Sequence, residues 1–394
     1  MSEDLQSIRR SMNNYVSMLK SENGFMYAGY PRFMELFGRD SIISGVELFY
    51  IYPDILKNTL MVLAGNQGII YNTGTGEEPG KILHELADAR TFRYNPSKEK
   101  WVKPSVPLYY SIDSTPLFVY ACELYIEKTN DTGFMDYIRK HMERSVSWMI
   151  EKSGKTGFLT YNNIEFGDKL ASQGWLDGAW SLYGKWKGDT ALIEVQGYFY
   201  QAMKQYNELF QENPMRSAIE KRIDFLENNI NRYFWLGDEE YYSPAVFFTG
   251  NGMEKLNTIT SSAGHLLLTG LIDRSSKTAI VKRLFENDMK TPFGIRTVSS
   301  LSDYFDPYKY QAGSIWPQDN WLILQGLKRH GFKKEAKMLR DYILNAILAI
   351  RDPYEYYSVD LDGNMINMDQ LEIYPCMPQA WSTGAFMEIL DDKF

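Results

Sequence analysis

The chain has 394 residues, of which 44% are hydrophobic and 23% charged, an ordinary globular composition with enough material for a large core. Lys and Arg together number 42 and Asp and Glu 50, so the formal net charge is -8, and the chain contains no basic run that could follow a phosphate backbone. These values argue against nucleic acid as a partner.

The chain also lacks the signals of a membrane or secreted protein. The most apolar early segment, 42–63, is interrupted by Glu47, Asp54 and Lys57, so it cannot span a bilayer. The first ten residues are polar where a signal peptide would need an apolar stretch. We therefore expect a soluble, cytoplasmic protein without a membrane partner.

The cysteine and histidine content bounds the chemistry further. Cys122 and Cys376 lie far apart and show no paired metal-ligand spacing, so we expect free, buried thiols in a reducing compartment. The four histidines form no H-x-x-x-H pattern, and His84 and His265 read as hydrogen-bonded structural residues. We expect neither a metal site nor a cofactor.

Helical periodicity dominates the chain. In 214–233 the apolar residues Met215, Ile219, Ile223, Leu226, Ile230 and Tyr233 recur at steps of three and four, which predicts one buried stripe on a surface helix. Residues 333–351 show the same pattern and end before Pro353. The same test along the whole chain predicts helices at about 3–20, 40–50, 54–66, 113–128, 132–152, 189–210, 214–233, 256–270, 272–287, 313–330, 333–351 and 378–391.

The spacing of these helices predicts the architecture. No strand series alternates with them, which disfavours a parallel α/β sheet, and no low-complexity linker divides the chain. Alternate helices begin near residues 40, 113, 189, 256, 313 and 378, so a helix pair recurs at a regular interval. Six such hairpins can close into an all-α (α/α)6 barrel, which we expect to form a single domain over 1–394. The long loops before the inner helices would then converge on one rim.

Those loops contain the unusual residues. Aromatic residues make up 15% of the chain, and many stand beside Gly, Asp, Asn or Gln, a mixture typical of a sugar-binding pocket as well as of an aromatic core. The loop segments are LFGRDS (36–41), EEPGKILHE (77–85), YYSIDSTPL (109–117), QGWLDGAW (173–180), EVQGYFY (194–200), FGIRT (293–297), YQAGSIWPQDN (310–320) and LEIYPCMPQAWS (371–382).

The order of these motifs resembles a known family. FGRDS, EEPGKILHE, SIDSTPLF, GIRT, GSIWPQDN and EIYPCMPQAWS are similar to segments of the catalytic domain of the amylo-alpha-1,6-glucosidase (glycogen debranching) family, relatives of the glucoamylases among the six-hairpin glycosidases. The resemblance runs from about 36 to 382. It implies an (α/α)6 barrel with a pocket-shaped, inverting, exo-acting site.

The resemblance also implies roles for single residues. The general acid matches Asp177, the general base matches Glu372, and the pair Arg39 and Asp40 matches residues that bind the hydroxyls of the non-reducing sugar. Glu194 matches a substrate-contacting glutamate. We expect the remaining binding residues to be Asp113, Trp175, Trp316, Gln318 and Trp381.

Physical chemistry supports the same pair of acids. An inverting glycosidase needs one protonated carboxyl group on the leaving oxygen and one carboxylate that activates water. Trp175, Leu176 and Trp180 surround Asp177 in the sequence, and desolvation by such neighbours would keep its carboxyl group protonated near neutrality. Glu372 stands just before the last predicted inner helix, whose N-terminus would stabilise a carboxylate.

Each assignment has a structural alternative. Asp177 could cap a turn, Arg39 with Asp40 could cap a helix, and Asp113 is a plausible N-cap. Trp316 and Trp381 could be core residues. Glu372 could simply pair with an arginine such as Arg296, while Glu165 and Asp168 are rival acids in the same loop as Asp177.

The sequence thus predicts a cofactor-free glycoside hydrolase that releases α-linked glucose from an oligosaccharide or small glycoside. Two alternatives stay open: the same fold acting on trehalose or on a mannosyl- or glucosylglycerate, and a carbohydrate-binding toroid without catalysis. The sequence does not give the oligomeric state.

Overall fold

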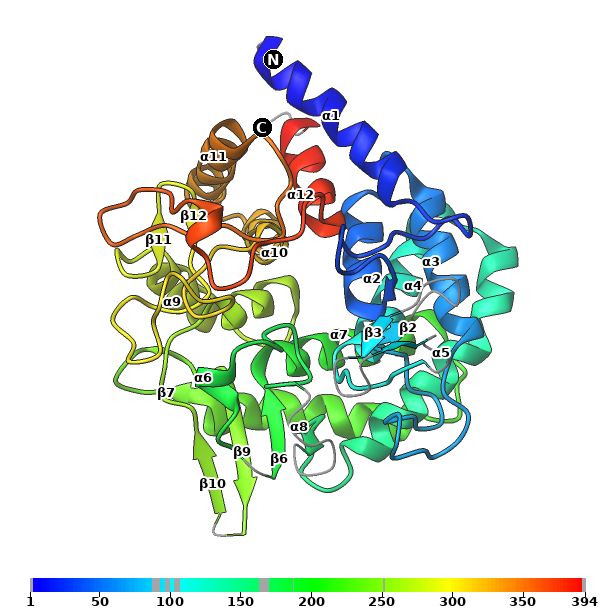
Figure 1. Ribbon diagram of the computed structural model, residues 1–394. Helices are drawn as coiled ribbons and strands as arrows, with labels where there is room; N and C mark the ends of the chain where they lie inside the picture. The colour runs from blue at the N-terminus through cyan, green and yellow to red at the C-terminus, as the bar shows by residue number, and fades with distance from the viewer. Residues whose placement is uncertain are drawn as a thin grey trace.

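The helical elements form two concentric layers around a ring (Figure 1). The computed structural model describes residues 3–86, 93–95, 100–102, 107–162, 170–186, 188–250 and 252–391. The inner layer consists of α2 (Gly38–Glu47), α4 (Ser114–Thr129), α7 (Ile193–Leu209), η2 (Ser261–Leu268), α10 (Pro317–Arg329) and α12 (Ala380–Asp391). Each inner element packs against the next, and α12 returns to α2, so the inner layer is a closed ring.

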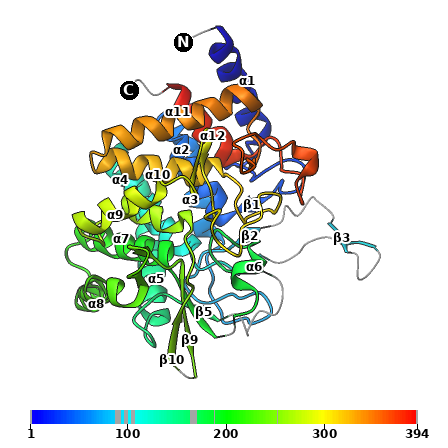
Figure 2. The same ribbon diagram turned by 90° about the vertical axis from the view of Figure 1, so that its left-hand side faces the viewer.

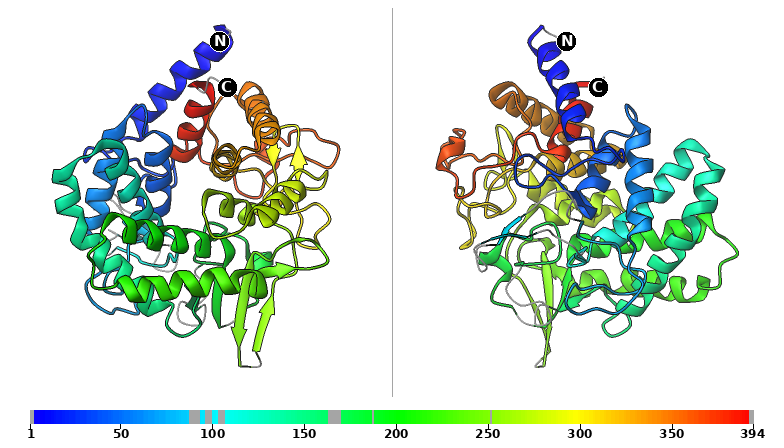
Figure 3. Two further views of the ribbon diagram at one scale, coloured as in Figure 1. Left: turned by 180° about the vertical axis from the view of Figure 1, so that it is seen from behind. Right: turned by 45° about the vertical axis from the view of Figure 1, so that its right-hand side comes forward.

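The outer layer supplies one partner for each inner element. It consists of α1 (Glu3–Leu19), α3 (Pro53–Gly65), α5 (Thr132–Lys152), α8 (Arg216–Phe234), α9 (Arg274–Leu284) and α11 (Lys333–Ile350). Five of these pack on the inner element that precedes them in the chain, whereas α1 packs on α12. The view from behind shows both layers (Figure 3, left). The fold is therefore the (α/α)6 toroid that the spacing of the helices predicts.

Burial differs between the two layers as the sequence patterns indicate. On the outer helix α8, Ile219, Leu226 and Ile230 are buried while the polar side chains between them face solvent. The inner helix α10 is buried on nearly every side, polar residues such as Asp319 and Asn320 included. Each large apolar side chain that the core buries contributes about 1.5–3 kcal/mol.

The ends of the helices follow local chemistry. Asp131 begins α5 by accepting a hydrogen bond from the amide of Phe134 at 2.9 Å, and Asp273 begins α9 by accepting one from the amide of Ser276 at 2.8 Å. Pro53 and Pro317 occupy the first turns of α3 and α10, where the missing N–H costs no hydrogen bond. The predicted helix boundaries are accurate to a few residues at these positions.

Two predicted inner helices differ from the structure. The segment predicted at 256–270 is a 3-10 helix, η2, that begins only at Ser261. Residues 189–192 precede α7 as strand β6 (Asp189–Leu192), which lies in an antiparallel sheet of order β10 (Gly252–Lys255), β9 (Ala245–Thr249), β6, β5 (Tyr161–Asn162). This sheet extends from the ring (Figure 1). Strands therefore lie in the two long segments between predicted helices, one between 132–152 and 189–210 and one between 214–233 and 256–270.

The remaining short elements lie in the loops. Pairs of strands form between β1 (Leu36–Phe37) and β2 (Glu85–Leu86), β3 (Arg93–Asn95) and β4 (Lys100–Val102), β7 (Trp235–Leu236) and β8 (Tyr241–Tyr242), and β11 (Lys290–Thr291) and β12 (Gly294–Ile295). Every strand pair in the described part of the chain is antiparallel, as expected where no parallel α/β sheet exists. The loops also contain two single turns, α6 (Trp180–Tyr183) and η3 (Met368–Gln370).

The loops before the inner elements gather at one end of the ring. In the side view, β1, β2 and α6 lie together on the same side, away from the outer helices α8 and α9 (Figure 2). Cys122 and Cys376 are buried free thiols, as predicted. No helix of the described residues is long and apolar enough to cross a membrane.

Candidate active site

A cavity of about 830 Å³ opens among the gathered loops. It is bordered by the segment before α2, the loop that contains Asp177, the segment before α10, and the two loops on either side of η3. Its lining includes the predicted site residues Arg39, Asp40, Trp175, Asp177, Trp316, Glu372 and Trp381. The fold thus brings seven of the ten predicted catalytic and binding residues to one cavity.

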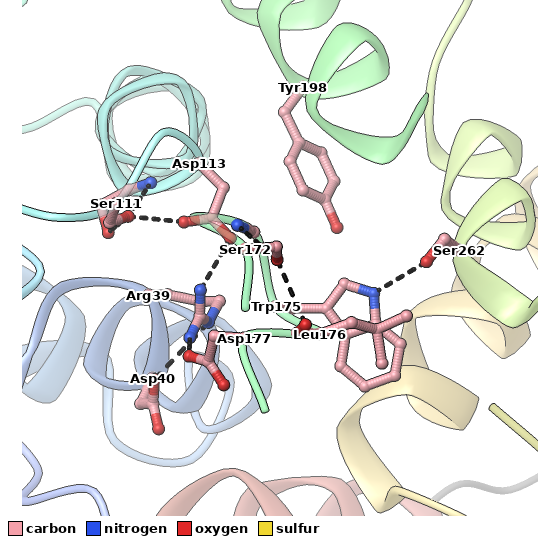
Figure 4. Close-up of polar contacts among 12 residues, drawn as sticks. Arg39, Asp40, Ser111, Asp113, Ser172, Trp175, Leu176, Asp177, Tyr198 and Ser262 are labelled. Carbon is pink, nitrogen blue, oxygen red and sulfur yellow. Dashed lines mark hydrogen bonds and ion pairs between the residues drawn. The ribbon is translucent and has the colours of Figure 1, made fainter. Parts of the chain in front are cut away.

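Arg39 organises one wall of this cavity (Figure 4). Its Nη1 donates to Asp113 Oδ2 at 2.9 Å, its Nη2 donates to Asp177 Oδ2 at 2.7 Å, and its Nε lies 3.7 Å from Asp40 Oδ2. The guanidinium is buried, and three acids from three different segments share its charge. Next to Arg39, Gly38 lets the start of α2 lie close to residue 83, because a Cβ at that position would lie 2.2 Å from the carbonyl oxygen of Leu83.

Asp113 holds Arg39 from behind. The residue is fully buried at the start of α4, and its Oδ1 accepts a hydrogen bond from the hydroxyl of Ser111 at 2.6 Å. The helix-capping alternative is only half right: Asp113 occupies the N-cap position of α4, but its side chain makes no capping hydrogen bond. Its carboxylate is occupied by Arg39 and Ser111 instead.

Asp177 lies at the surface of the cavity. Burial raises the pKa of its carboxyl group, and the ion pair and hydrogen bond with Arg39 oppose this effect without cancelling it. Two of its three apolar neighbours, Trp175 and Leu176, are buried as the sequence predicts, but Trp180 is 46% exposed, so the prediction for Trp180 is wrong. The carboxyl group of Asp177 therefore keeps its proton to a higher pH than a solvent-exposed aspartate.

Gln311 fixes the loop that carries Asp177. Its Oε1 accepts a hydrogen bond from the amide of Gly178 at 2.8 Å, and its Nε2 donates to the carbonyl oxygen of Trp175 at 2.9 Å. The indole N–H of Trp175 donates to Ser262 at 3.2 Å, which ties the same loop to η2. Hydrogen bonds on both sides of Asp177 therefore fix the backbone of its loop.

Glu355, which the sequence analysis did not single out, lines the same cavity and is 1% exposed. It accepts hydrogen bonds from the hydroxyl of Tyr310, from the amide of Cys376 at 3.0 Å and from Arg32 Nη2 at 3.1 Å. Burial raises the pKa of Glu355; the three donors lower it, and repulsion by Asp177 raises it again, so the pKa stays above its ordinary value.

Glu372 lines the cavity at its edge, with a side chain that is 43% exposed. Its Oε1 accepts from Lys309 Nζ at 2.8 Å. The suggested pairing with Arg296 does not form, because that guanidinium donates to the carbonyl oxygens of Val359 and Asp360 at 2.5 and 2.7 Å. Of the two candidate bases, Glu355 is the buried one and Glu372 the exposed one.

Three predicted binding residues lie behind the cavity lining. Asp113, Glu194 and Gln318 are buried, at 0%, 1% and 2% exposure, and none of them borders the cavity. Trp316 and Trp381, for which the sequence left open a pocket or a core position, both line the cavity and are also buried in the core. The rival acids Glu165 and Asp168 lie outside the described residues.

The two histidines singled out in the sequence occupy different settings. His265 lies in a buried chain between the hydroxyl of Tyr198 at 2.6 Å and Asp319 Oδ1 at 2.8 Å, the structural role expected for it. His84 lines the cavity, and burial together with the charges of Arg39 and Lys81 lowers its pKa to about 3. His84 is therefore neutral at physiological pH.

The buried carboxyl group of Glu194 should make the stability of the fold depend on pH. Burial raises its pKa to about 8, and among the described residues its Oε2 has no hydrogen-bond partner. Between the unfolded pKa near 4.5 and the folded pKa, the unfolded state releases a proton that the folded state retains, so the free energy of unfolding falls as pH rises. Glu194→Gln is expected to remove this decline, worth on the order of a few kcal/mol, in urea unfolding measured at pH 5 and pH 8. An equally steep decline in the variant would contradict the assignment.

Comparison with known proteins agrees with this arrangement. The family model described as the mannosylglycerate hydrolase MGH1-like glycoside hydrolase domain matches residues 75–361, well over half of the chain. The chain belongs to this family. Membership agrees with the predicted six-hairpin glycosidase, but it does not support the amylo-alpha-1,6-glucosidase family in particular.

A curated relative points the same way over a shorter stretch. The chain is 26% identical over 146 residues to a mannosylglycerate hydrolase from Rubrobacter radiotolerans. This match covers 36% of the chain and about a third, 32%, of the relative.

Solved structures share the whole fold. The GH63 mannosylglycerate hydrolase of Thermus thermophilus, in complex with Tris and D-glycerate, superposes with a TM-score of 0.71 at 14% identity, covering 97% of this chain and 99% of that one. A protein described as a glycosidase superposes with a TM-score of 0.67 at 11% identity, covering 98% and 96%. At such low identity these neighbours show a common toroid.

Proposed function

We propose that this member of the MGH1-like family is an inverting glycoside hydrolase that acts on a small hexosyl glycoside with an acidic aglycone, of the mannosylglycerate or glucosylglycerate type. The observation that carries the proposal is the cavity itself, in which the partly buried carboxyl group of Asp177 and the buried one of Glu355 border a space large enough for such a molecule. The family match supports this class of substrate over a glucose oligosaccharide.

In this proposal Asp177 is the general acid. Its raised pKa keeps a proton available, and the oxygen that is not paired with Arg39 would carry that proton to the glycosidic oxygen. Bond cleavage then leaves the aglycone as an alcohol and Asp177 as a carboxylate, whose charge Arg39 stabilises. The held loop keeps the carboxyl group in place throughout.

We assign the general base to Glu355 in place of Glu372. The ionised form of Glu355 is stabilised by donors from Tyr310, Arg32 and the amide of Cys376, and it lies within the cavity instead of at its edge. Its carboxylate would take a proton from water as that water attacks the anomeric carbon, so the hexose leaves with inverted configuration. Glu372, paired with Lys309 at the rim, is assigned to the aglycone end.

The positive charges at the edge of the cavity, on Arg32 and Lys309, favour an acidic aglycone. Arg32 lines the cavity with a side chain that is 36% exposed, and Lys309 stands beside Glu372 with a side chain that is 52% exposed. A carboxylate on the aglycone would share these two cations with their present partners, Glu355 and Glu372, and such charge-assisted contacts are stronger than neutral ones. A structural neighbour from Thermus thermophilus was solved with D-glycerate bound, which is an aglycone of this kind.

A substrate panel tests the proposal. We expect hexose release from mannosylglycerate or glucosylglycerate to exceed release from trehalose, maltose and isomaltose, and proton NMR to show the inverted anomer first. Asp177→Asn should lower this rate by roughly 10²–10⁴-fold, the usual contribution of general acid catalysis. Preferred release from isomaltose would restore the glucosidase alternative, and binding without turnover of any glycoside would favour a non-catalytic toroid.

A further inference from the structure

A second cavity, of about 500 Å³, lies apart from the first and shares no lining residue with it. It is bordered by the loop 71–78, by the C-terminal end of α5, and by β5 and the start of β6. We propose that this second cavity binds a neutral saccharide, with Tyr71 as the ring on which the sugar stacks.

Tyr71 has the features of a stacking platform. The residue is 68% exposed, yet its hydroxyl is tied to Glu151 Oε1 at 2.9 Å, so the ring is held while its face stays open to solvent. Ile69 and Ile70, which precede Tyr71 in the chain, are 72% and 54% exposed, although neither lines the second cavity. An apolar sugar face packs on a ring of this kind, and a ring already held loses little conformational entropy on binding.

The polar groups of the second cavity are planar and already oriented. Glu78 accepts from the indole N–H of Trp148 at 2.9 Å and from Lys152 at 2.8 Å. Asp189 accepts from Asn162 at 3.0 Å and from Lys155 at 2.6 Å. Carboxylate and amide groups in such networks offer both donors and acceptors to sugar hydroxyls, and they need no reorganisation before they do so.

The charge of the second cavity selects against acidic ligands. Its lining contains the carboxylates of Glu77, Glu78, Glu151 and Asp189 but only two lysines, Lys152 and Lys155. A phosphate or an acidic glycoside would meet an excess of negative charge, whereas an uncharged hexose unit would not. The second cavity is therefore suited to an uncharged saccharide.

Calorimetry with maltotriose and α-1,2-mannobiose tests the proposal. The titrations use the full chain carrying Asp177→Asn, so that the probe is not consumed. We expect binding of at least one probe that weakens on the order of tenfold in Tyr71→Ala and returns in Tyr71→Trp, because the larger ring keeps the stacking surface. Tyr137→Ala is the matched control, since Tyr137 is a 44% exposed tyrosine on α5 outside either cavity, and it should bind as the parent does.

Three outcomes would overturn the proposal: no binding of either probe at tens of millimolar, equal binding in Tyr71→Ala and parent, or displacement of the probe by mannosylglycerate, which would place it in the first cavity. Hydrolysis of a small glycoside by Tyr71→Ala in the otherwise unchanged chain should match the parent. The binding result stands on its own, because it does not depend on which glycoside the first cavity hydrolyses.

Discussion

Replacing Glu355 with Gln is expected to lower kcat by roughly 10²–10⁴-fold with little change in the free energy of unfolding. Glutamine keeps the shape and can accept a hydrogen bond from either Tyr310 or the amide of Cys376, which donate to different oxygens of Glu355, but it cannot take a proton from water. Steady-state kinetics on the best substrate of the panel, together with urea unfolding, separates the chemical effect from a structural one.

Glu372→Gln is the matched control for that experiment. The residue lines the same cavity and undergoes the same chemical change, but its carboxylate is exposed and paired with Lys309 at the rim. We expect it to lower KM for an acidic glycoside, because the substitution removes a negative charge and frees Lys309, and to change kcat by less than about tenfold. A large loss of kcat in Glu372→Gln with normal turnover in Glu355→Gln would return the role of base to Glu372.

Arg39→Met is expected to destabilise the fold by about 3–5 kcal/mol and to abolish turnover. The substitution leaves Asp113 buried without its ion-pair partner and removes the cation shared with Asp177 and Asp40. Burial raises the pKa of Asp40 to about 7, although the positive charge of Arg39 lowers it. Without Arg39 the pKa of Asp40 would rise further. Urea unfolding at pH 7 measures the stability, and glycoside hydrolysis measures the turnover.

The control for this effect is an arginine on the surface. Arg216→Met removes an exposed ion pair with Glu220 on α8, which should cost less than about 1 kcal/mol. If Arg39→Met were no more destabilising than Arg216→Met, the cluster around Arg39 would not be a structural centre of the site.

The fold could be predicted from the sequence because the periodic apolar pattern of its helices recurs along the chain. Each inner helix needs an apolar surface on most sides and each outer helix needs one stripe, so the periodicity of α8 or α11 reports both the helix and its layer. The ribbon of β5, β6, β9 and β10 was missed because its strands have two to five residues and depend on one another for pairing. Such short segments carry no periodicity of their own.

The site was predictable only in part. Asp177 was found because its neighbours Trp175 and Leu176 indicate desolvation, and the structure places it in the cavity with a raised pKa. Glu355 stands between Tyr354 and Tyr356, the same kind of signal, and could have been found by it. Glu372 was chosen as the base because the family resemblance matches it and because it stands before α12. Both Glu372 and Glu355 line the cavity, and which of the two carboxylates is buried there depends on packing that no local pattern encodes.

The seam of the ring lies where the two ends of the chain meet. The inner circle closes between α12 and α2, and α1 packs on α12 near both ends of the chain (Figure 1). Arg9 on α1 donates two hydrogen bonds to the carboxylate of Asp391, at 2.8 and 2.7 Å. A ring of this kind has no obligatory starting point: a chain opened at an exposed turn between two other hairpins and joined by a short linker across the seam would retrace the same circle.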